Sequence, residues 1–215
     1  MYKKTLENIE LVPFNDVSFD IQMETRGWRN KADVARYFKI PAIDEATHEN
    51  WLASLRVDRP KSMAFFIRFD GDFIGVAYFH SISYTDKSAD FGIYITNADD
   101  RNKGIGTTVL KKMIRYAAAV MRFRRLFLDV LASNKRAIAV YEGCGFAPTG
   151  ENDGDFCRYN HPPPFQAREA YEQQNGVCVK CSAAGATASS RLCNNPVAIR
   201  TPIPDNKKAP KFQGF

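Results

Sequence analysis

Residues 101–108, which read Arg-Asn-Lys-Gly-Ile-Gly-Thr-Thr, constrain this chain more than any other segment. They lie between a run of β-forming residues that ends at Thr96 and a segment, 107–121, whose apolar residues recur at helical spacing. Two glycines let the backbone bend so that several N–H groups point into one concavity, and the following helix adds the positive end of its dipole. The segment therefore predicts a pyrophosphate site, with added charge or hydroxyl groups from Arg101, Lys103, Thr107 and Thr108.

A glycine-rich turn without any ligand would show the same pattern, because a lone Gly-x-Gly is a weak signal. The third glycine of the dinucleotide-binding fingerprint is missing, and no βαβ unit opens the chain. A second motif is needed to decide between a turn and a site.

The periodicity of the first 160 residues predicts one α/β domain. β-forming runs predict strands at 9–13, 62–69, 73–82, 89–96 and 126–131, and a last strand from Phe146. Helical spacing predicts helices at 18–25, 31–38, 45–55, 107–121 and 134–142. This order indicates an α+β mixed sheet, mostly antiparallel and flanked by helices on both faces.

Two local signals support these boundaries. Asp70-Gly71 lies between two β-forming runs, which is typical of a hairpin turn. Asp44 precedes the third helix and is a suitable N-cap residue.

The composition changes at 161–164, which read His-Pro-Pro-Pro. We therefore expect a domain over 1–160 and an accessory tail over 161–215. A short helix is expected at 167–174, and the rest of the tail is expected to be largely irregular.

The second motif runs from Asn134 to Phe146, with Ala137, Val140-Tyr141 and Gly145 at set positions. Together with 101–108 it resembles the GNAT acetyltransferase superfamily. In that family a loop of the form Arg/Gln-x-x-Gly-x-Gly/Ala precedes Asn-x-x-Ala-x-x-Leu/Val-Tyr and Gly-Phe. The resemblance covers residues 1–160 and implies an enzyme that moves an acetyl group from acetyl-CoA to a primary amine.

The resemblance also implies how the cofactor would bind. Main-chain amides of 103–108 would hold the pyrophosphate, the edge of the strand at 91–95 would pair with the pantetheine arm, and a side-chain amide would hydrogen-bond that arm. The cofactor-binding candidates are Ile93, Tyr94, Ile95, Arg101, Lys103, Gly104, Ile105, Gly106, Thr107, Thr108 and Asn134.

Catalysis requires a proton donor for the leaving thiolate and a base for the attacking amine. The resemblance assigns the donor to Tyr141, although a core-facing aromatic residue would fit the same position. Asp90 and His48 are equal candidates for the base, and His80 is a rival because imidazole titrates near neutrality.

Three segments limit the choice of acceptor amine. They are Trp28-Arg29-Asn30, the helix with His48 and the segment 86–94. This combination is similar to the acetyltransferases that act on the 4-amino group of a UDP-linked amino-sugar in pseudaminic acid biosynthesis. An arginine suits a phosphate or a uracil ring, and a tryptophan offers an aromatic face. The tryptophans would also fit a core, and enzymes that acetylate protein N-termini share a similar Trp-Arg segment. The substrate-binding candidates are Trp28, Arg29, Asn30, His48 and His80.

Three cysteines of the tail, Cys178, Cys181 and Cys193, are weak candidates for a zinc knuckle. Cys157 or His161 would have to supply the fourth ligand. The opening of HNH nucleases is similar, but no histidine follows His161, so a nuclease centre cannot be assembled. A tail without metal is the alternative.

The net charge of +6 suits a polyanionic cofactor as readily as nucleic acid. An acyltransferase that modifies a protein or nucleic-acid amine, or a non-enzymatic nucleic-acid-binding module, is therefore an alternative. No apolar run approaches the ~20 residues that span a bilayer, so no membrane partner is expected. The N-terminus lacks a signal-peptide pattern and the cysteine count is odd, which favours the cytoplasm. The sequence is also compatible with a homodimer.

Overall fold

The computed structural model describes residues 6–162, which form one seven-stranded sheet with helices on both faces. The strands are β1 (Ile9–Pro13), β2 (Met63–Phe69), β3 (Asp72–Ser83), β4 (Ser88–Ile95), β5 (Arg125–Leu131), β6 (Ala147–Asp153) and β7 (Phe156–His161). The α-helices are α1 (Phe19–Arg29), α2 (Ala32–Ala35), α3 (Glu45–Ser54), α4 (Ile105–Ala119) and α5 (Lys135–Gly143). Short 3-10 helices occupy Leu6–Asn8, Phe14–Asp16 and Ala98–Asp100.

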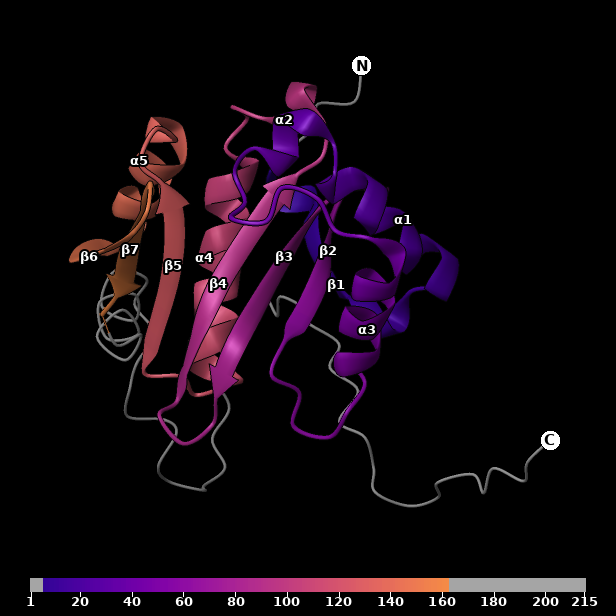
Figure 1. The fold of residues 1–215 in the computed structure, drawn as a ribbon, viewed down its shortest axis with the longest axis horizontal. Coiled ribbons are helices and arrows are strands. Elements are labelled where there is room, and N and C mark those ends of the chain that lie inside the picture. Colours follow the sequence, from indigo (N-terminus) through magenta and orange to yellow (C-terminus); the bar gives the residue numbers. More distant parts are fainter. Residues whose placement is uncertain (1–5, 163–215) are drawn as a thin grey trace, which may run out of the picture. The chain divides into compact units, whose positions relative to one another are not determined.

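The strand order is β1-β2-β3-β4-β5-β7-β6, and every pair is antiparallel except β4–β5, which is parallel. The predicted α/β fold with a mostly antiparallel mixed sheet is therefore confirmed. Figure 1 shows the sheet across the molecule, with α1 and α3 beside β1–β3 and α5 beside β5 and β7.

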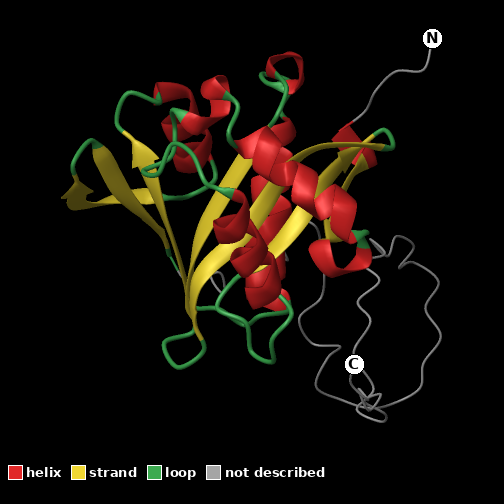
Figure 2. Ribbon diagram, turned by 45° about the vertical axis from the view of Figure 1, so that its right-hand side comes forward, coloured by secondary structure: helices red, strands yellow, loops and turns green. Residues whose placement is uncertain are grey.

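The two faces of the sheet bury different residues, because side chains alternate along a strand. In β2, Phe65 and Ile67 join the cluster that includes α4, whereas Ala64 and Phe66 join the cluster that includes Leu52 of α3. Both faces of the central strands are thus covered, as Figure 2 shows from a second direction.

The parallel pair β4–β5 is short. It joins only Ser88, Ala89 and Asp90 to Arg125, Leu126 and Phe127, after which the two strands separate. Figure 1 shows β4 and β5 close at their lower ends and apart at their upper ends. Beyond Asp90, one edge of β4 is free of strand pairing within the described residues.

The structure differs from the sequence predictions at three helices. Helix α1 continues through Gly27 to Arg29 because Trp28 packs edge-on against Phe66 at a centroid distance of 6.0 Å, so tertiary packing outweighs the low helix propensity of glycine. Helix α2 is a single turn. Helix α4 begins at Ile105, two residues earlier than expected, because Gly104 adopts a left-handed conformation with φ of 78°.

Strand β7 was not predicted. Its inward-facing residues are Cys157, Tyr159 and His161, a set too polar to stand out as a buried face. The Asp153-Gly154 pair before it was an available hairpin signal.

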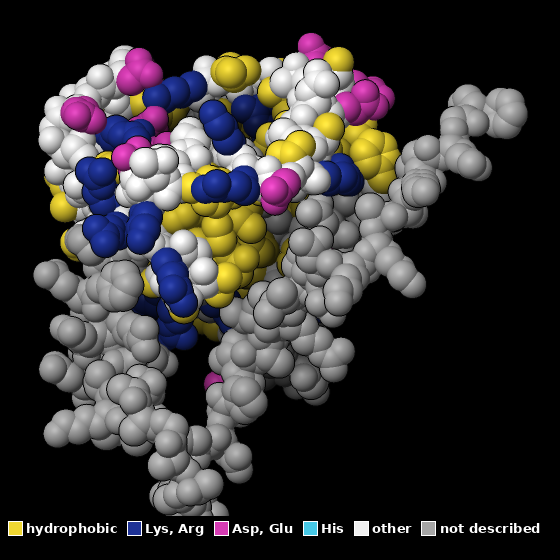
Figure 3. All heavy atoms as spheres, turned by 90° about the horizontal axis from the view of Figure 1, so that it is seen from below, with side chains coloured by type: hydrophobic (Ala, Val, Ile, Leu, Met, Phe, Trp, Pro, Cys, Tyr) yellow, Lys and Arg dark blue, Asp and Glu magenta, His cyan; other side chains and the backbone are white. Residues whose placement is uncertain are grey.

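Lys and Arg side chains of α4 and of the turn before β5 are exposed or half-buried. Figure 3, which views the molecule from below Figure 1, shows basic side chains spread around an apolar area and interspersed with uncharged and acidic residues. No helix among the described residues is long and apolar enough to cross a membrane.

The predictions for the tail lie outside the described residues. These are the helix at 167–174, the irregular remainder and the zinc ligands Cys178, Cys181 and Cys193. Within 6–162, His, Cys, Asp and Glu side chains form no group of three that could hold a metal ion.

Candidate active site

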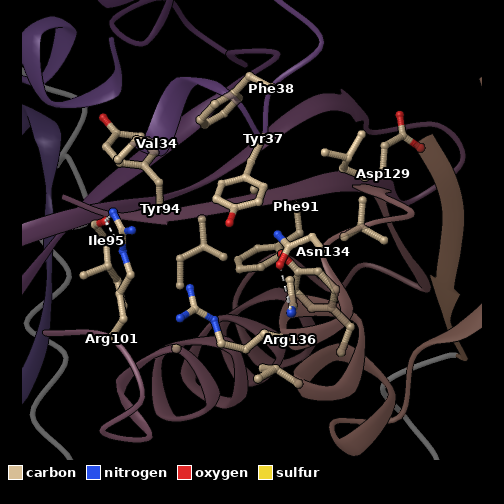
Figure 4. Close-up of a pocket in the computed structure, with 18 of the residues that line it drawn as sticks. Val34, Tyr37, Phe38, Phe91, Tyr94, Ile95, Arg101, Asp129, Asn134 and Arg136 are labelled. Carbon is tan, nitrogen blue, oxygen red and sulfur yellow. Dashed lines mark hydrogen bonds between the residues drawn. The ribbon is translucent and has the colours of Figure 1, made fainter. Parts of the chain in front are cut away.

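A cavity of about 600 Å³ lies where β4 and β5 separate. Its walls come from the start of α4, from α5, from β3–β5 and from the segment 36–44 between α2 and α3, which we call the strap. Figure 4 shows Tyr37 and Phe38 of the strap on the side opposite Arg136 of α5, with Phe91 and Asn134 between them.

The start of α4 supplies main-chain hydrogen-bond donors to this cavity. The first bond of the helix runs from the amide of Thr108 to the carbonyl of Gly104, so the three preceding amides have no intrahelical acceptor. Gly104, the N-cap residue, has no side chain that could cap these amides, and Gly104, Gly106 and Thr107 line the cavity. A Cβ atom added at Gly106 would meet nothing within 4 Å. The residues present therefore fit a pyrophosphate at a helix N-terminus.

The cations of this loop have partners in the described protein. The Arg101 guanidinium donates through Nη2 to the carbonyl of Ile95 at 3.0 Å and to Oδ2 of Asp33 at 2.7 Å. It lines the cavity while tying the loop to β4 and α2. The exposed ammonium of Lys103 pairs with Asp100 at 3.3 Å. Ile105 is 1% exposed and packs in the core, so only its main chain faces the site.

The free edge of β4 and the N-cap of α5 both lie on the wall of the cavity. Ile93, Tyr94 and Ile95 line the cavity along the unpaired edge. Oδ1 of Asn134 accepts a hydrogen bond from the amide of Ala137 at 3.3 Å, which caps α5. Asn134 lines the cavity, and its Nδ2 group has no hydrogen-bond partner among the described residues.

Tyr141 of α5 lines the same cavity and packs near Phe146 at a centroid distance of 6.0 Å. Burial raises the pKa of Tyr141, and the neighbouring Tyr78 adds to the rise. The phenol therefore stays protonated at neutral and mildly alkaline pH, so it can act as a proton donor there.

The three candidate bases lie in different environments. His80 lines the cavity, and burial lowers its pKa while the carboxylates of Asp90 and Asp129 partly offset that effect. Asp90, directly opposite His80 in the β3–β4 pair, is bound by the Arg158 guanidinium at 2.7 Å.

His48 lies between α1 and α3 rather than on the cavity wall. It is 2% exposed, and its Nε2 is 3.0 Å from the carbonyl oxygen of Gln22 and 3.3 Å from the hydroxyl of Thr25. The structure thus does not bring His48 together with Tyr141 and His80.

The Trp28-Arg29-Asn30 segment divides its residues between core and cavity. Trp28 packs against the buried cluster, and Asn30 exchanges two hydrogen bonds with the backbone of Ile43 at 2.8 and 3.1 Å, which anchors the strap. Arg29 alone of the three lines the cavity. Its Nη2 donates to the carbonyl of Ile40 at 2.7 Å, and its guanidinium lies 4.3 Å from the ring centroid of Phe38.

Several cavity residues were missed from the sequence. Asp129 was detectable, because it is a carboxylate within a strand whose alternate positions are apolar. It accepts hydrogen bonds from Lys39 at 2.8 Å and Arg158 at 3.0 Å, and these outweigh partial burial and lower its pKa. The strap residues carried no signal, since their role depends on how the chain folds back over β4. Other lining residues that the sequence did not indicate are Tyr37, Phe38, Lys39, Tyr78, Gly92 and Arg136.

The chain is similar to known acetyltransferases in sequence. The family described as "Acetyltransferase (GNAT) domain" matches residues 9–147. Acetyltransferase PseH of Campylobacter jejuni strain 81-176 is 32% identical over 129 residues, which are 60% of this chain and 78% of that protein. The spermidine N(1)-acetyltransferase of Vibrio cholerae is 30% identical over 77 residues, 36% of this chain and 44% of that protein.

Solved structures show the same fold. The Vibrio cholerae spermidine N-acetyltransferase in complex with CoA and spermine has a TM-score of 0.64 at 20% identity, covering 73% of this chain and 96% of that one. Campylobacter jejuni PseH in complex with acetyl coenzyme A has a TM-score of 0.55 at 24% identity, covering 72% of this chain and 98% of that one. With a family match that spans most of the described domain and a helix N-terminus suited to a pyrophosphate, this chain belongs to the GNAT family and is an acetyl-CoA-dependent N-acetyltransferase.

Proposed function

We propose that the acceptor is a small anionic molecule with a primary amine. The best match is a UDP-linked amino-sugar that is acetylated on its 4-amino group. The observation that carries this proposal is the environment of Arg29. Its guanidinium is half-buried at the cavity, and burial lowers its pKa. No carboxylate among the described residues forms an ion pair with it, so a ligand phosphate would supply the missing counter-charge.

The carboxylates of the cavity wall argue against a polycationic acceptor. A polyamine needs free acidic groups to match its ammonium groups. Asp33 is paired with Arg101 at 2.7 Å, and Asp129 is bonded to both Lys39 and Arg158. Both carboxylates are therefore already neutralised within the protein.

The aromatic side chains near Arg29 suit the base of a nucleotide. Phe38 lies against Arg29 and contacts Tyr94 edge-on at a centroid distance of 5.9 Å. Tyr37 extends from the strap toward the middle of the cavity in Figure 4. Aromatic faces next to a guanidinium are a common way to hold a uracil ring together with its phosphates. The similarity to PseH supports this assignment, while the similarity to spermidine acetyltransferases supports the rival one.

Bound acetyl-CoA supplies the thioester that the amine attacks. In our proposal the Tyr141 hydroxyl holds the proton that the departing sulfur requires. His80 accepts the proton of the amine, because it is the candidate base whose side chain lines the cavity and burial keeps it neutral near pH 7. Asp90 is engaged with Arg158, so we assign it to orienting its neighbours.

A coenzyme A release assay tests the acceptor class. The probes are a UDP-linked 4-amino-4,6-dideoxy sugar, the same sugar without UDP, and spermidine. We expect the UDP-linked sugar to have the highest kcat/KM. Equal activity toward the free and UDP-linked sugars, or a preference for spermidine, would overturn the proposal.

Arg29→Ala sharpens the same test. We expect the Michaelis constant for the UDP-linked sugar to rise by about 10- to 150-fold, the effect of losing a charged hydrogen bond worth about 1.5–3 kcal/mol. The constant for acetyl-CoA should stay close to wild type. Asn30→Ala is the matched control, because it loosens the strap at Ile43 without removing a charge from the cavity.

A further inference from the structure

Tyr78 of β3 and Gly92 of β4 form a directly opposed pair in the sheet. A Cβ atom built on Gly92 would lie 2.2 Å from Cζ and 2.5 Å from the hydroxyl oxygen of Tyr78. The tip of the phenol therefore occupies the space where the side chain of any other residue at 92 would begin. Because Gly92 has no side chain, the Tyr78 ring crosses β4 and reaches the cavity.

The Tyr78 hydroxyl has no hydrogen-bond partner among the described residues, although its residue is half-buried and lines the cavity. Burial raises the pKa of Tyr78 to about 12, and the nearby Arg29 charge opposes that rise. The hydroxyl opens onto the cavity with its hydrogen-bonding capacity unused, so a ligand bound there can accept a hydrogen bond from it. Tyr84 provides a contrast within the same chain, because its hydroxyl donates to the carbonyl of Pro60 at 2.9 Å.

Tyr78 also lies between the two ends of the proposed acceptor site. It is close enough to affect the pKa of Tyr141 at the reacting end and that of Arg29 at the anion-binding end. Tyr94, which lines the cavity as well, donates instead to the carbonyl of Thr25 at 3.3 Å. The free hydroxyl at this junction is thus that of Tyr78.

We propose that Tyr78 positions the acceptor by a hydrogen bond from its hydroxyl, and that Gly92 serves to let the phenol reach that place. The inference rests on acetyl transfer in this cavity and not on the identity of the acceptor. It adds a specificity-determining pair, one residue of which acts only by lacking a side chain.

Tyr78→Phe tests the hydroxyl alone. With the preferred probe, either the UDP-linked amino-sugar or spermidine, we expect the acceptor KM to rise about 3- to 10-fold, the range for one neutral hydrogen bond. The KM for acetyl-CoA and the melting temperature should not change, because the hydroxyl has no partner in the described protein.

Tyr84→Phe is the matched control and should behave in the opposite way. It removes a hydroxyl that is bonded within the fold and lies away from the cavity lining, so it should lower the melting temperature and leave the acceptor KM unchanged. An acceptor KM in Tyr78→Phe equal to wild type, or a lower melting temperature with no kinetic change, would show that Tyr78 only packs.

Gly92→Ala tests the glycine. The new methyl group must displace the phenol, so we expect acceptor kcat/KM to fall more than in Tyr78→Phe. In a Tyr78→Ala background the same change should add little, since no phenol remains to be displaced. Additive losses would contradict the pairing of these residues. If spermidine proves the better probe, the proposed acceptor class fails while the Tyr78 test still stands or falls by itself.

Discussion

The two halves of the active-site cavity are built in different ways. We assign the cofactor half to three short segments, 91–95, 101–108 and 134–141. It presents mainly backbone groups, which are the amides at the start of α4 and the free edge of β4. The acceptor half consists of side chains from α1, the strap, β3, β4 and β5, and its members Arg29 and Asp129 are far apart in the sequence.

This difference indicates how readily substitutions can alter the ligand that each half binds. A main-chain site tolerates many side chains as long as the loop geometry persists, which suits a cofactor shared by a whole family. A site made of converging side chains changes with single substitutions, which suits an acceptor that differs between relatives. Mutations should therefore affect the two substrates separately, and the four predictions below test that separation.

Tyr141→Phe should have the largest effect, because we assign Tyr141 to the chemical step itself. We expect kcat to fall about 10²- to 10⁴-fold, the usual range for a positioned acid, with near-normal binding of acetyl-CoA. Steady-state kinetics together with calorimetric binding would measure both quantities. Turnover equal to wild type at every pH would mean that Tyr141 is a packing residue.

Gly106→Asp should act on the cofactor half alone. The new carboxylate projects into open space, so the fold is preserved, but it would repel the pyrophosphate. We expect the Kd for acetyl-CoA to rise about 100-fold, or about 2.7 kcal/mol. The increase in melting temperature that acetyl-CoA produces should be lost in parallel.

Gly106→Ala is the matched control, since it adds bulk without charge. It should weaken acetyl-CoA much less. If Gly106→Asp kept the full thermal shift, the start of α4 would not be the pyrophosphate site.

His80→Gln should affect the acceptor half through its protonation state. Burial lowers the pKa of His80, so the base form is present above that pKa and is lost as the pH falls through it. Wild-type kcat should therefore decline only below pH ~6.5, the ordinary histidine value. In the variant we expect kcat to fall about 10- to 100-fold and the profile to shift to higher pH, toward the pKa of the acceptor amine.

His48→Gln provides the comparison for this experiment. Because His48 is buried between α1 and α3, its substitution should lower the melting temperature and leave the shape of the pH profile unchanged. A displaced profile in His48→Gln and a normal one in His80→Gln would reverse the assignment of the base.

Lys39→Met should have the smallest effect. Lys39 joins the strap to Asp129 of β5 and Asp153 of β6, each at 2.8 Å, and its ammonium is partly exposed. Exposed ion pairs contribute only about 0.2–1 kcal/mol, so we expect the acceptor KM to rise about 2- to 3-fold. High salt screens these ion pairs in the wild type, so the difference in acceptor KM between the variant and the wild type should shrink as salt is added. Acetyl-CoA binding should not change.

The fold was largely predictable because its signals are local. The Asp44 N-cap, the Asp70-Gly71 hairpin and the apolar spacing of α4 each depend on a few neighbouring residues, and all three are present in the structure. Strand β7 escaped prediction because its buried face includes a cysteine and a histidine. The extension of α1 escaped because Trp28 packs against Phe66, a residue distant in the sequence.

The sequence by itself predicted the backbone donors at the start of α4, since the glycine-rich turn opens that helix and leaves its first amides without intrahelical acceptors. Only the tertiary structure decided the acceptor half. It turned His48 into the α1–α3 interface, engaged Asp90 with Arg158, and left Arg29 and His80 at the cavity. The physical reason is that a site made of side chains depends on which distant segments meet. Packing and charge pairing across the whole sheet decide which segments those are. Gly92 is the clearest case, because only the structure shows that the Tyr78 ring occupies the space where a side chain at position 92 would lie.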